Sequence, residues 1–219
     1  DVPVNKNTLL SLINFGKDDE PSLAVSKVSY KGEPVVAILA DSEAQALAAR
    51  KLVRIDYDPL PAVFDVEETL KSGAPVVNET YPGNYFEYHE RFDHQKLRFG
   101  DVERGFAGAD IVMEHRYQMS PIEHAPTETN GSIAAPEQNG RYLVHSCAQG
   151  LFFSLGTTAK IVDVESNQLH FIGGTVGGGF GGKVDSLTEP LAVLGAMLTG
   201  RPVRFVLDRE EEMLYGSPR

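Results

Sequence analysis

A glycine-rich stretch at residues 177–183 (GGGFGGK) constrains this chain more than any other feature. Each glycine loses more conformational entropy on folding than other residues and has no side chain to pack, so stability does not explain the stretch. It offers backbone N–H groups that a ligand can approach closely. Residues 169–172 before it predict a strand, and residues 185–198 after it predict a helix. A glycine-rich turn between a strand and a helix is typical of an anion-binding site.

Two phosphate-binding motifs fit parts of the glycine stretch. The first seven positions of a P-loop fit residues 177–183, but the next residue, which must place a hydroxyl on Mg²⁺, is Val184. A valine cannot ligate magnesium, so the P-loop is rejected. The dinucleotide fingerprint GxGxxG fits residues 177–182, but the acid that should follow is Asp208, further along the chain than is usual. A Rossmann-type, NAD-binding oxidoreductase remains an alternative.

Composition limits the other classes of function. The net charge of −11 argues against nucleic acid and anionic membranes as partners. Cys147 is the single cysteine, which excludes an internal disulfide or an iron–sulfur site and fits a reducing, cytoplasmic location. The sequence contains no run of eighteen apolar residues, so no membrane span is predicted. The chain opens on Asp1 and stops at Arg219 after a helix-like stretch, which suggests a piece of a longer protein.

Local patterns predict alternating strands and helices. Ser42 and Asp101 are predicted to cap helices, and a short helix is predicted over residues 65–70. A further helix is predicted over residues 149–161, and Ser186 with Glu189 predicts a capping box that opens a helix with a buried leucine stripe. The predicted strands are residues 28–30, 35–40, 53–57, 111–119, 131–135, 141–145, 169–172 and 203–207.

An aromatic and histidine-rich segment at residues 85–94 invites a metal-binding interpretation. It contains His89 and His94, but the spacing matches no fixed metal-ligand pattern. A linker with stacked aromatic side chains explains the segment better, so no metal site is predicted there.

Several stretches along the chain, in order, match the motifs of one enzyme family. They are residues 27–37 (KVSYKGEPVVA), 53–62 (VRIDYDPLPA), 100–102 (GDV), 124–128 (HAPTE), 172–183 (IGGTVGGGFGGK), 199–205 (TGRPVRF) and 208–211 (DREE). Together they resemble the large, molybdopterin-binding subunit of the molybdenum hydroxylases, which include xanthine dehydrogenase, aldehyde oxidase and nicotinate dehydrogenase. The first two stretches resemble its hammerhead domain, and the next two resemble the opening of its first cofactor-binding domain.

The resemblance implies an enzyme that inserts oxygen from water into an electron-poor carbon of an N-heterocycle or an aldehyde. Phe180 and Gly181 would donate main-chain N–H groups to the molybdenum ligands, while Gly179 and Gly182 would allow the close approach. Gln149 matches the family glutamine whose side-chain amide hydrogen-bonds an oxo ligand. A neutral amide can donate there without titrating. Without the resemblance, Gln149 would be interpreted as a helix N-terminal residue with no ligand.

Other residues near these motifs have simpler interpretations. Lys183 could contact a cofactor phosphate, but a solvated lysine explains it equally well. Cys147 is interpreted as a buried, inert thiol. Three residues match family positions near the start of the cofactor domain: Glu123, His124 and Glu128. Their roles are predicted to be mostly structural.

Two departures from the family pattern affect the predicted chemistry. Many purine-oxidising relatives have a substrate-facing glutamate at the position of Val184, so the resemblance favours another heteroaromatic or a less polar substrate. Phe180 would either fill a gap in the core or form part of the pocket wall. The general-base glutamate of the family lies far downstream, beyond Arg219. No residue here is therefore assigned as catalytic, and this fragment alone is predicted to be inactive.

These observations predict an α+β fold, with a hammerhead-like α/β domain followed by the first part of the molybdopterin-binding domain. The predicted ranges are residues 1–75 for the hammerhead-like domain, 76–99 for a linker and 100–219 for the cofactor domain. The implied cofactor is a molybdenum–pterin, with its cytosine dinucleotide form left open. Iron–sulfur clusters and FAD would lie on other domains or subunits, and an oligomer is expected. A non-catalytic binding or assembly module with a degenerate loop is the non-enzyme alternative.

Overall fold

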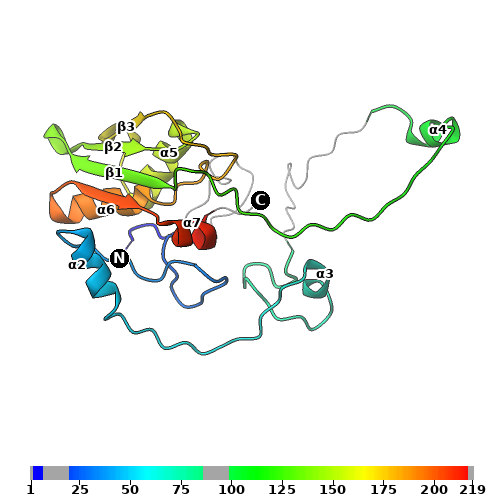
Figure 1. Ribbon diagram of the computed structural model, residues 1–219, viewed down its shortest axis with the longest axis horizontal. Helices are drawn as coiled ribbons and strands as arrows, with labels where there is room; N and C mark the ends of the chain where they lie inside the picture. Colours follow the sequence, from blue (N-terminus) through cyan, green and yellow to red (C-terminus); the bar gives the residue numbers. More distant parts are fainter. Residues whose placement is uncertain (1, 7–19, 86–98, 217–219) are drawn as a thin grey trace.

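The computed structural model describes residues 2–6, 20–85 and 99–216, and Figure 1 shows its ribbon. His89 and His94, for which no metal site is predicted, lie outside the described residues. The helices are α2 (Glu43–Arg50), α3 (Val66–Thr69), α4 (Val102–Ala107), α5 (Leu151–Val162), α6 (Glu189–Thr199) and α7 (Arg209–Tyr215), with 3-10 turns η1 (Gln138–Gly140) and η2 (Ser166–Gln168). The strands are β1 (Gly131–Pro136), β2 (Tyr142–Ser146), β3 (Leu169–Gly173) and β4 (Val203–Val206).

These strands form one mixed sheet in the order β3-β2-β1-β4. β1 is antiparallel to both neighbours, with Ala134 opposite Val144 of β2 and Ile133 opposite Arg204 of β4. β2 and β3 are parallel, and β3, which leads into the glycine stretch, lies at the edge of the sheet. A dinucleotide-binding fold would place this turn at the switch point of a doubly wound parallel sheet. The observed sheet therefore does not support the Rossmann alternative.

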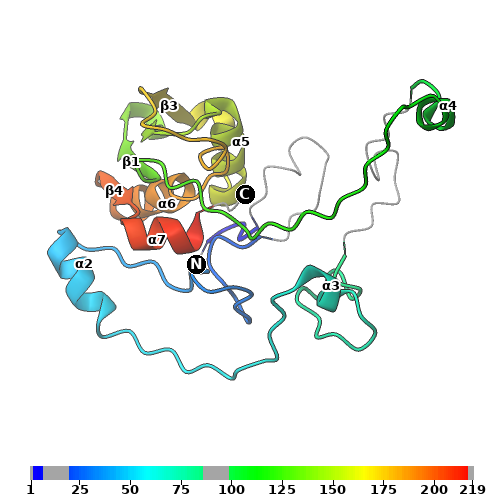
Figure 2. The ribbon, with the colours of Figure 1, turned by 45° about the vertical axis from the view of Figure 1, so that its right-hand side comes forward.

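Helices α5 and α6 lie beside the sheet and enclose the hydrophobic core with it (Figure 2). The buried core residues come from both layers: Ala134, Val144, Ala159, Val162, Leu169, Ala192, Val193 and Ala196. Half of them are alanines, and small side chains let the helices approach the strands closely at the packing density of protein interiors. This packing of helices on a mixed sheet confirms the predicted α+β class.

The predicted helix caps are confirmed. The side chains of Ser42 and Asp101 each accept a hydrogen bond from a backbone N–H group in the first turn of α2 and α4, respectively. Asp65, at the start of the short helix predicted over residues 65–70, caps α3 in the same way. Gly200 ends α6 in the left-handed conformation, with φ +65°. These short-range signals succeeded because the cap residue and the N–H group that it binds lie within one turn of each other.

The predicted start and buried face of the helix after the glycine stretch are wrong. α6 begins at Glu189 with Thr188 as its N-cap, and Ser186 lies in the irregular segment before it. After its first turn, α6 buries Ala192, Val193, Gly195 and Ala196, whereas Leu198 of the predicted leucine stripe is 72% exposed. The physical reason is the close approach to the sheet: a Cβ added at Gly195 would lie 3.3 Å from the Val203 side chain.

Four of the predicted strands do not form, although the structure describes their residues. Residues 28–30, 35–40, 53–57 and 111–119 belong to no strand. The last of these lies on the extended segment that leads from α4, which stands well away from the sheet (Figures 1 and 2). A β-strand is stable only where a neighbouring strand pairs with its backbone groups. The alternating pattern is present, but no partner strand lies beside these segments within the described part of the chain.

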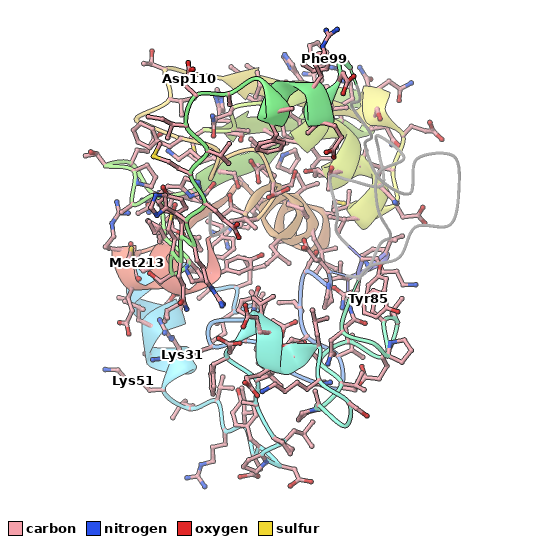
Figure 3. The ribbon with its side chains drawn as sticks, turned by 90° about the vertical axis from the view of Figure 1, so that its right-hand side faces the viewer. Lys31, Lys51, Tyr85, Phe99, Asp110 and Met213 are labelled. Atoms are coloured by element: carbon pink, nitrogen blue, oxygen red, sulfur yellow. The ribbon has the colours of Figure 1, made fainter. Side chains whose placement is uncertain are left out.

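Helix α2 of the N-terminal region lies against the second part of the chain. Arg50 at its end forms an ion pair of 3.4 Å with Glu211 of α7, and Asp41 before it pairs with Arg201 at 2.5 Å. In Figure 3, α2, which ends near Lys51, lies directly below α7. These ion pairs are exposed and contribute little to stability each. They join positions that are 161 and 160 residues apart in the sequence.

Candidate functional site

The glycine stretch forms an irregular turn between β3 and α6, as predicted. Gly178, Phe180 and Gly181 have positive φ angles of +94°, +55° and +105°. The N–H of Gly182 closes the turn on the carbonyl of Gly179 at 2.8 Å. A phenylalanine with positive φ costs about 1–3 kcal/mol, and such strain persists only where the surroundings fix it. The turn therefore has one defined backbone shape.

Gln149, which follows the end of β2, is bound to this turn at three points. Its side-chain Oε1 accepts hydrogen bonds from the backbone N–H groups of Gly181 and Lys183, each at 3.1 Å. Its own backbone N–H donates to the carbonyl of Lys183 at 2.8 Å. Two donors on one oxygen fix the orientation of the carboxamide. The Nε2 group has no acceptor among the described residues, and Gln149 is exposed.

This contact explains why residue 179 is glycine. A Cβ added at Gly179 would lie 2.5 Å from both Cδ and Oε1 of Gln149. This distance is shorter than any van der Waals contact, so a side chain at residue 179 would displace the Gln149 carboxamide. The predicted site residues Gln149, Gly179, Gly181 and Gly182 are thus brought together by the fold. The N–H group of Gly181, which the resemblance assigned to the molybdenum ligands, donates to Gln149 in this structure.

The two remaining positions of the predicted site are Phe180 and Val184. The Phe180 side chain is 63% exposed, so it does not fill a gap in the core of the described structure. Val184 is half-buried and directly follows Lys183 at the end of the turn. Their predicted roles, in a pocket wall and toward the substrate, stay predictions.

Lys183 is neither solvated nor free to reach a phosphate. Its side chain is fully buried, with 0% exposure, and its Nζ forms an ion pair of 2.7 Å with Oε2 of Glu128. The same oxygen accepts the backbone N–H of Gly177 at 2.8 Å. The hydrogen bond from Lys183 lowers the pKa of the Glu128 carboxyl. Glu128, predicted to be mostly structural, therefore binds both ends of the glycine stretch.

A second buried pair supports the turn from the side of α7. The Asn130 side-chain amide donates to the carbonyl of Gly182 at 3.3 Å and to Oε1 of Glu212 at 3.0 Å. The backbone N–H of Asn130 donates to the other oxygen of Glu212 at 2.8 Å. Sequence reasoning missed both residues, because no local pattern joins positions 82 residues apart.

His124 packs against the turn. Its side chain is 6% exposed, and its Nδ1 lies 3.0 Å from where a Cβ of Gly182 would stand. That nitrogen has no hydrogen-bond partner in the described structure, and Oε1 of Glu123 is 4.0 Å away. Cys147 is half-buried, and burial raises the pKa of its thiol, in keeping with the predicted inert cysteine.

Glu189, at the start of α6, is a buried carboxyl joined to the segment that leads to Gln149. The hydroxyl of Ser146 donates to its Oε1 at 2.5 Å and accepts the backbone N–H of Ala148 at 3.0 Å. Burial raises the pKa of the Glu189 carboxyl. The folded protein thus binds the proton of the Glu189 carboxyl more tightly than the unfolded chain does. This difference stabilises the folded state at low pH, and the stabilisation is lost as the pH rises from the ordinary pKa of 4.5 through the raised pKa of the folded state.

We expect Glu189→Gln to remove this pH dependence. The thermal unfolding midpoint of the variant, relative to the unchanged protein, should rise between pH 4 and pH 8, by about 2–4 °C for each 1 kcal/mol. Differential scanning calorimetry across this range measures the effect, with Glu103→Gln on the exposed helix α4 as the matched control. A midpoint difference that does not change with pH would contradict the assignment.

Within the described part of the chain, no group of three histidine, cysteine, aspartate or glutamate residues is placed to hold a metal ion. No helix described in the structure is long and apolar enough to cross a membrane. The site is instead a glycine-rich cradle with an oriented carboxamide beside it. A glycine-rich backbone of fixed shape is typical of proteins that bind anionic groups through backbone N–H donors.

Comparison with known proteins places the chain within this class. A model of the molybdopterin cofactor-binding domain matches residues 78–219, and one of the aldehyde oxidase and xanthine dehydrogenase a/b hammerhead domain matches residues 1–61. The chain is 30% identical to an aldehyde oxidoreductase of Megalodesulfovibrio gigas over 98% of its length, and 30% identical to aldehyde oxidase 2 of Rattus norvegicus over 94%. The chain belongs to the aldehyde oxidase and xanthine dehydrogenase family of molybdenum enzymes.

Solved structures agree with this assignment. The aldehyde oxidoreductase structure from Desulfovibrio gigas superposes with a TM-score of 0.83 over 98% of this chain, at 30% identity. Quinoline 2-oxidoreductase from Pseudomonas putida gives 0.77 over 91%, at 28% identity. The chain spans only 24% and 14% of the two curated relatives named above, and 23% and 25% of these two solved chains. The predicted family and the predicted order of its two domains are confirmed.

Proposed function

We propose that this chain forms one side of the molybdenum–pterin site of a hydroxylating dehydrogenase. The observation that supports it most directly is the carboxamide of Gln149, whose oxygen is fixed by two backbone N–H groups. Its remaining N–H donors suit an oxygen acceptor, because an oxo group accepts hydrogen bonds and offers none. The proposed domain division places the hammerhead-like part at residues 1–75, a linker at 76–99 and the cofactor part from residue 100.

The residues present fit such a cofactor in three respects. Gln149 would donate through Nε2, and Phe180 would donate its main-chain N–H at the apex of the turn. The lack of a side chain at Gly179 leaves room for the Gln149 carboxamide, and that at Gly182 leaves room for His124. When bound, a molybdenum–pterin supplies the two-electron oxidation that couples water-derived oxygen to an electron-poor carbon. Donors that are already in place stabilise developing negative charge without reorganisation, which is where such sites gain most of their rate.

For the substrate, we propose an aldehyde or a weakly polar N-heterocycle. Val184, next to the turn, offers no charge or hydrogen bond to a purine. Relatives bear the names aldehyde oxidoreductase and quinoline 2-oxidoreductase, and both names describe substrates with an electron-poor carbon. The general-base glutamate would come from a part of the enzyme outside this chain.

For its partners, we propose iron–sulfur and flavin domains or subunits that receive the electrons, in an oligomeric, cytoplasmic enzyme. A single cysteine in this chain fits that division, since the clusters must find their ligands elsewhere. The cofactor would be the molybdenum–pterin or its cytosine dinucleotide.

Metal analysis and isotope labelling test this function. We expect the purified holoenzyme to contain molybdenum and to oxidise members of a panel of aldehydes and N-heterocycles, with ¹⁸O from labelled water in the product. Absence of molybdenum together with tight NAD binding would overturn the proposal. Oxidation of xanthine at a rate equal to that of the best aldehyde would overturn the substrate class only.

A further inference from the structure

Lys183 is the largest fully buried side chain in the described structure, and nothing in the proposed chemistry uses it. A buried ammonium group is costly unless it is paired and hydrogen-bonded. Its partner, Glu128, lies on the segment that enters β1 and is 42% exposed. Burying the Lys183 ammonium group therefore costs folding free energy, which the ion pair with Glu128 offsets.

One carboxylate oxygen of Glu128 joins the two ends of the glycine stretch. It accepts the backbone N–H of Gly177 at 2.8 Å and the ammonium of Lys183 at 2.7 Å. The backbone N–H of Glu128 also donates to the carbonyl of Gly177 at 3.2 Å. A Cβ added at Gly177 would lie 2.5 Å from the Cβ of Glu128, so the two backbones are in close contact. The ion pair thus fixes the width of the turn.

Lys183 also connects this ion pair to Gln149. Its backbone N–H donates to Oε1 of Gln149 and its carbonyl accepts the backbone N–H of Gln149. The side chain of Lys183 faces Glu128 while its main chain faces Gln149. Any shift of Lys183 that follows loss of the ion pair would therefore move the backbone N–H group that orients the Gln149 carboxamide.

We propose that Glu128 and Lys183 are positioning residues of the molybdenum site: the ion pair between the buried Lys183 and Glu128 holds the glycine stretch in register with Gln149, so that the Gln149 Nε2 donors face the cofactor. This inference rests on the proposed function and assigns both residues a role without contact to cofactor or substrate. It also separates Lys183 from a phosphate-binding lysine, because its Nζ is enclosed and directed at Glu128.

The test uses three holoenzyme variants: Lys183→Met, Glu128→Gln and the double variant. Each single variant should retain most of its molybdenum but show altered g values in the Mo(V) electron paramagnetic resonance spectrum. The value of kcat should fall about tenfold to a hundredfold, with KM within about twofold, as expected for misplacement by a fraction of an ångström. The double variant should be no worse than the poorer single variant, because both lose one shared interaction. The exposed Lys71–Glu68 pair gives the matched control, as Lys71→Met with Glu68→Gln.

The alternatives give different results. If Lys183 bound a cofactor phosphate, Lys183→Met would lose molybdenum and pterin while Glu128→Gln kept both, and the inference would be overturned. A purely structural pair would lower the thermal unfolding midpoint with the Mo(V) spectrum and kcat unchanged in the folded fraction, which would also overturn it. Glu128→Gln preserves the shape of a partly exposed residue, so it answers the question if Lys183→Met does not fold. An unchanged protein without molybdenum would contradict the proposed function instead.

Discussion

Replacing Gly179 with alanine is expected to remove most of the molybdenum-dependent activity. The new Cβ would stand 2.5 Å from Cδ and Oε1 of Gln149, well inside any real contact distance. Either the carboxamide swings out or the turn shifts, and both changes break the hydrogen bonds from Gly181 and Lys183 to Oε1. Overpacking of this kind costs about 1–3 kcal/mol. Displacement of a preorganised donor costs about 100-fold in rate or more.

Activity per bound molybdenum and the Mo(V) spectrum measure the effect of Gly179→Ala. Gly174→Ala is the matched control, because nothing lies within 4 Å of a Cβ added at Gly174 and the residue needs no positive φ. The control should keep nearly all of its activity, apart from small backbone effects. Equal activity of Gly179→Ala and Gly174→Ala would show that the contact between Gly179 and Gln149 does not affect catalysis.

The local elements of this fold could be predicted from the sequence, and its distant contacts could not. The caps at Ser42 and Asp101 were predicted because a cap and its N–H partners lie within one turn. The alternating pattern at residues 53–57 and 111–119 carried no information about a pairing strand. Strand formation depends on that partner, which lies outside the pattern.

The candidate site shows the same division. The glycine content alone selected the glycine stretch, but Gln149 was selected through family resemblance, since an isolated glutamine after a strand has no signal of its own. The pairs Glu128–Lys183 and Asn130–Glu212 join positions 55 and 82 residues apart. A lysine after glycines suggested a phosphate or solvent, and only its burial revealed the ion pair. Buried charge is a tertiary property, and no local spacing encodes it.

Gln149→Glu should separate the donor role of Gln149 from its role as an anchor. A glutamate has nearly the same shape, and one carboxylate oxygen can still accept the N–H groups of Gly181 and Lys183. The other oxygen replaces the two Nε2 donors with a negatively charged acceptor. The turn should therefore stay in place while the side that faces the cofactor changes from donating to repelling. We expect the folded protein to keep its thermal unfolding midpoint within a few degrees.

The Gln149→Glu change should lower kcat far more than it lowers the thermal unfolding midpoint. Loss of one preorganised donor to a developing negative charge costs about 10²–10³ in kcat, and an added negative charge should increase that loss. Gln149→Ala serves as a second variant, since it removes donors and anchor together without adding charge. Gln45→Glu on the exposed helix α2 controls for the change in net charge. Stopped-flow reduction of the enzyme by an aldehyde measures the chemical step directly.

The order of the variants decides between the two roles. If Nε2 donates to the cofactor, Gln149→Glu should react more slowly than Gln149→Ala although its turn is better preserved. If Gln149 acts only by anchoring Gly181 and Lys183, the order should reverse, because the glutamate keeps those two hydrogen bonds and alanine loses them. The donor role and the anchor role thus predict opposite orders for the rates of Gln149→Glu and Gln149→Ala, and comparison of the two variants distinguishes the roles.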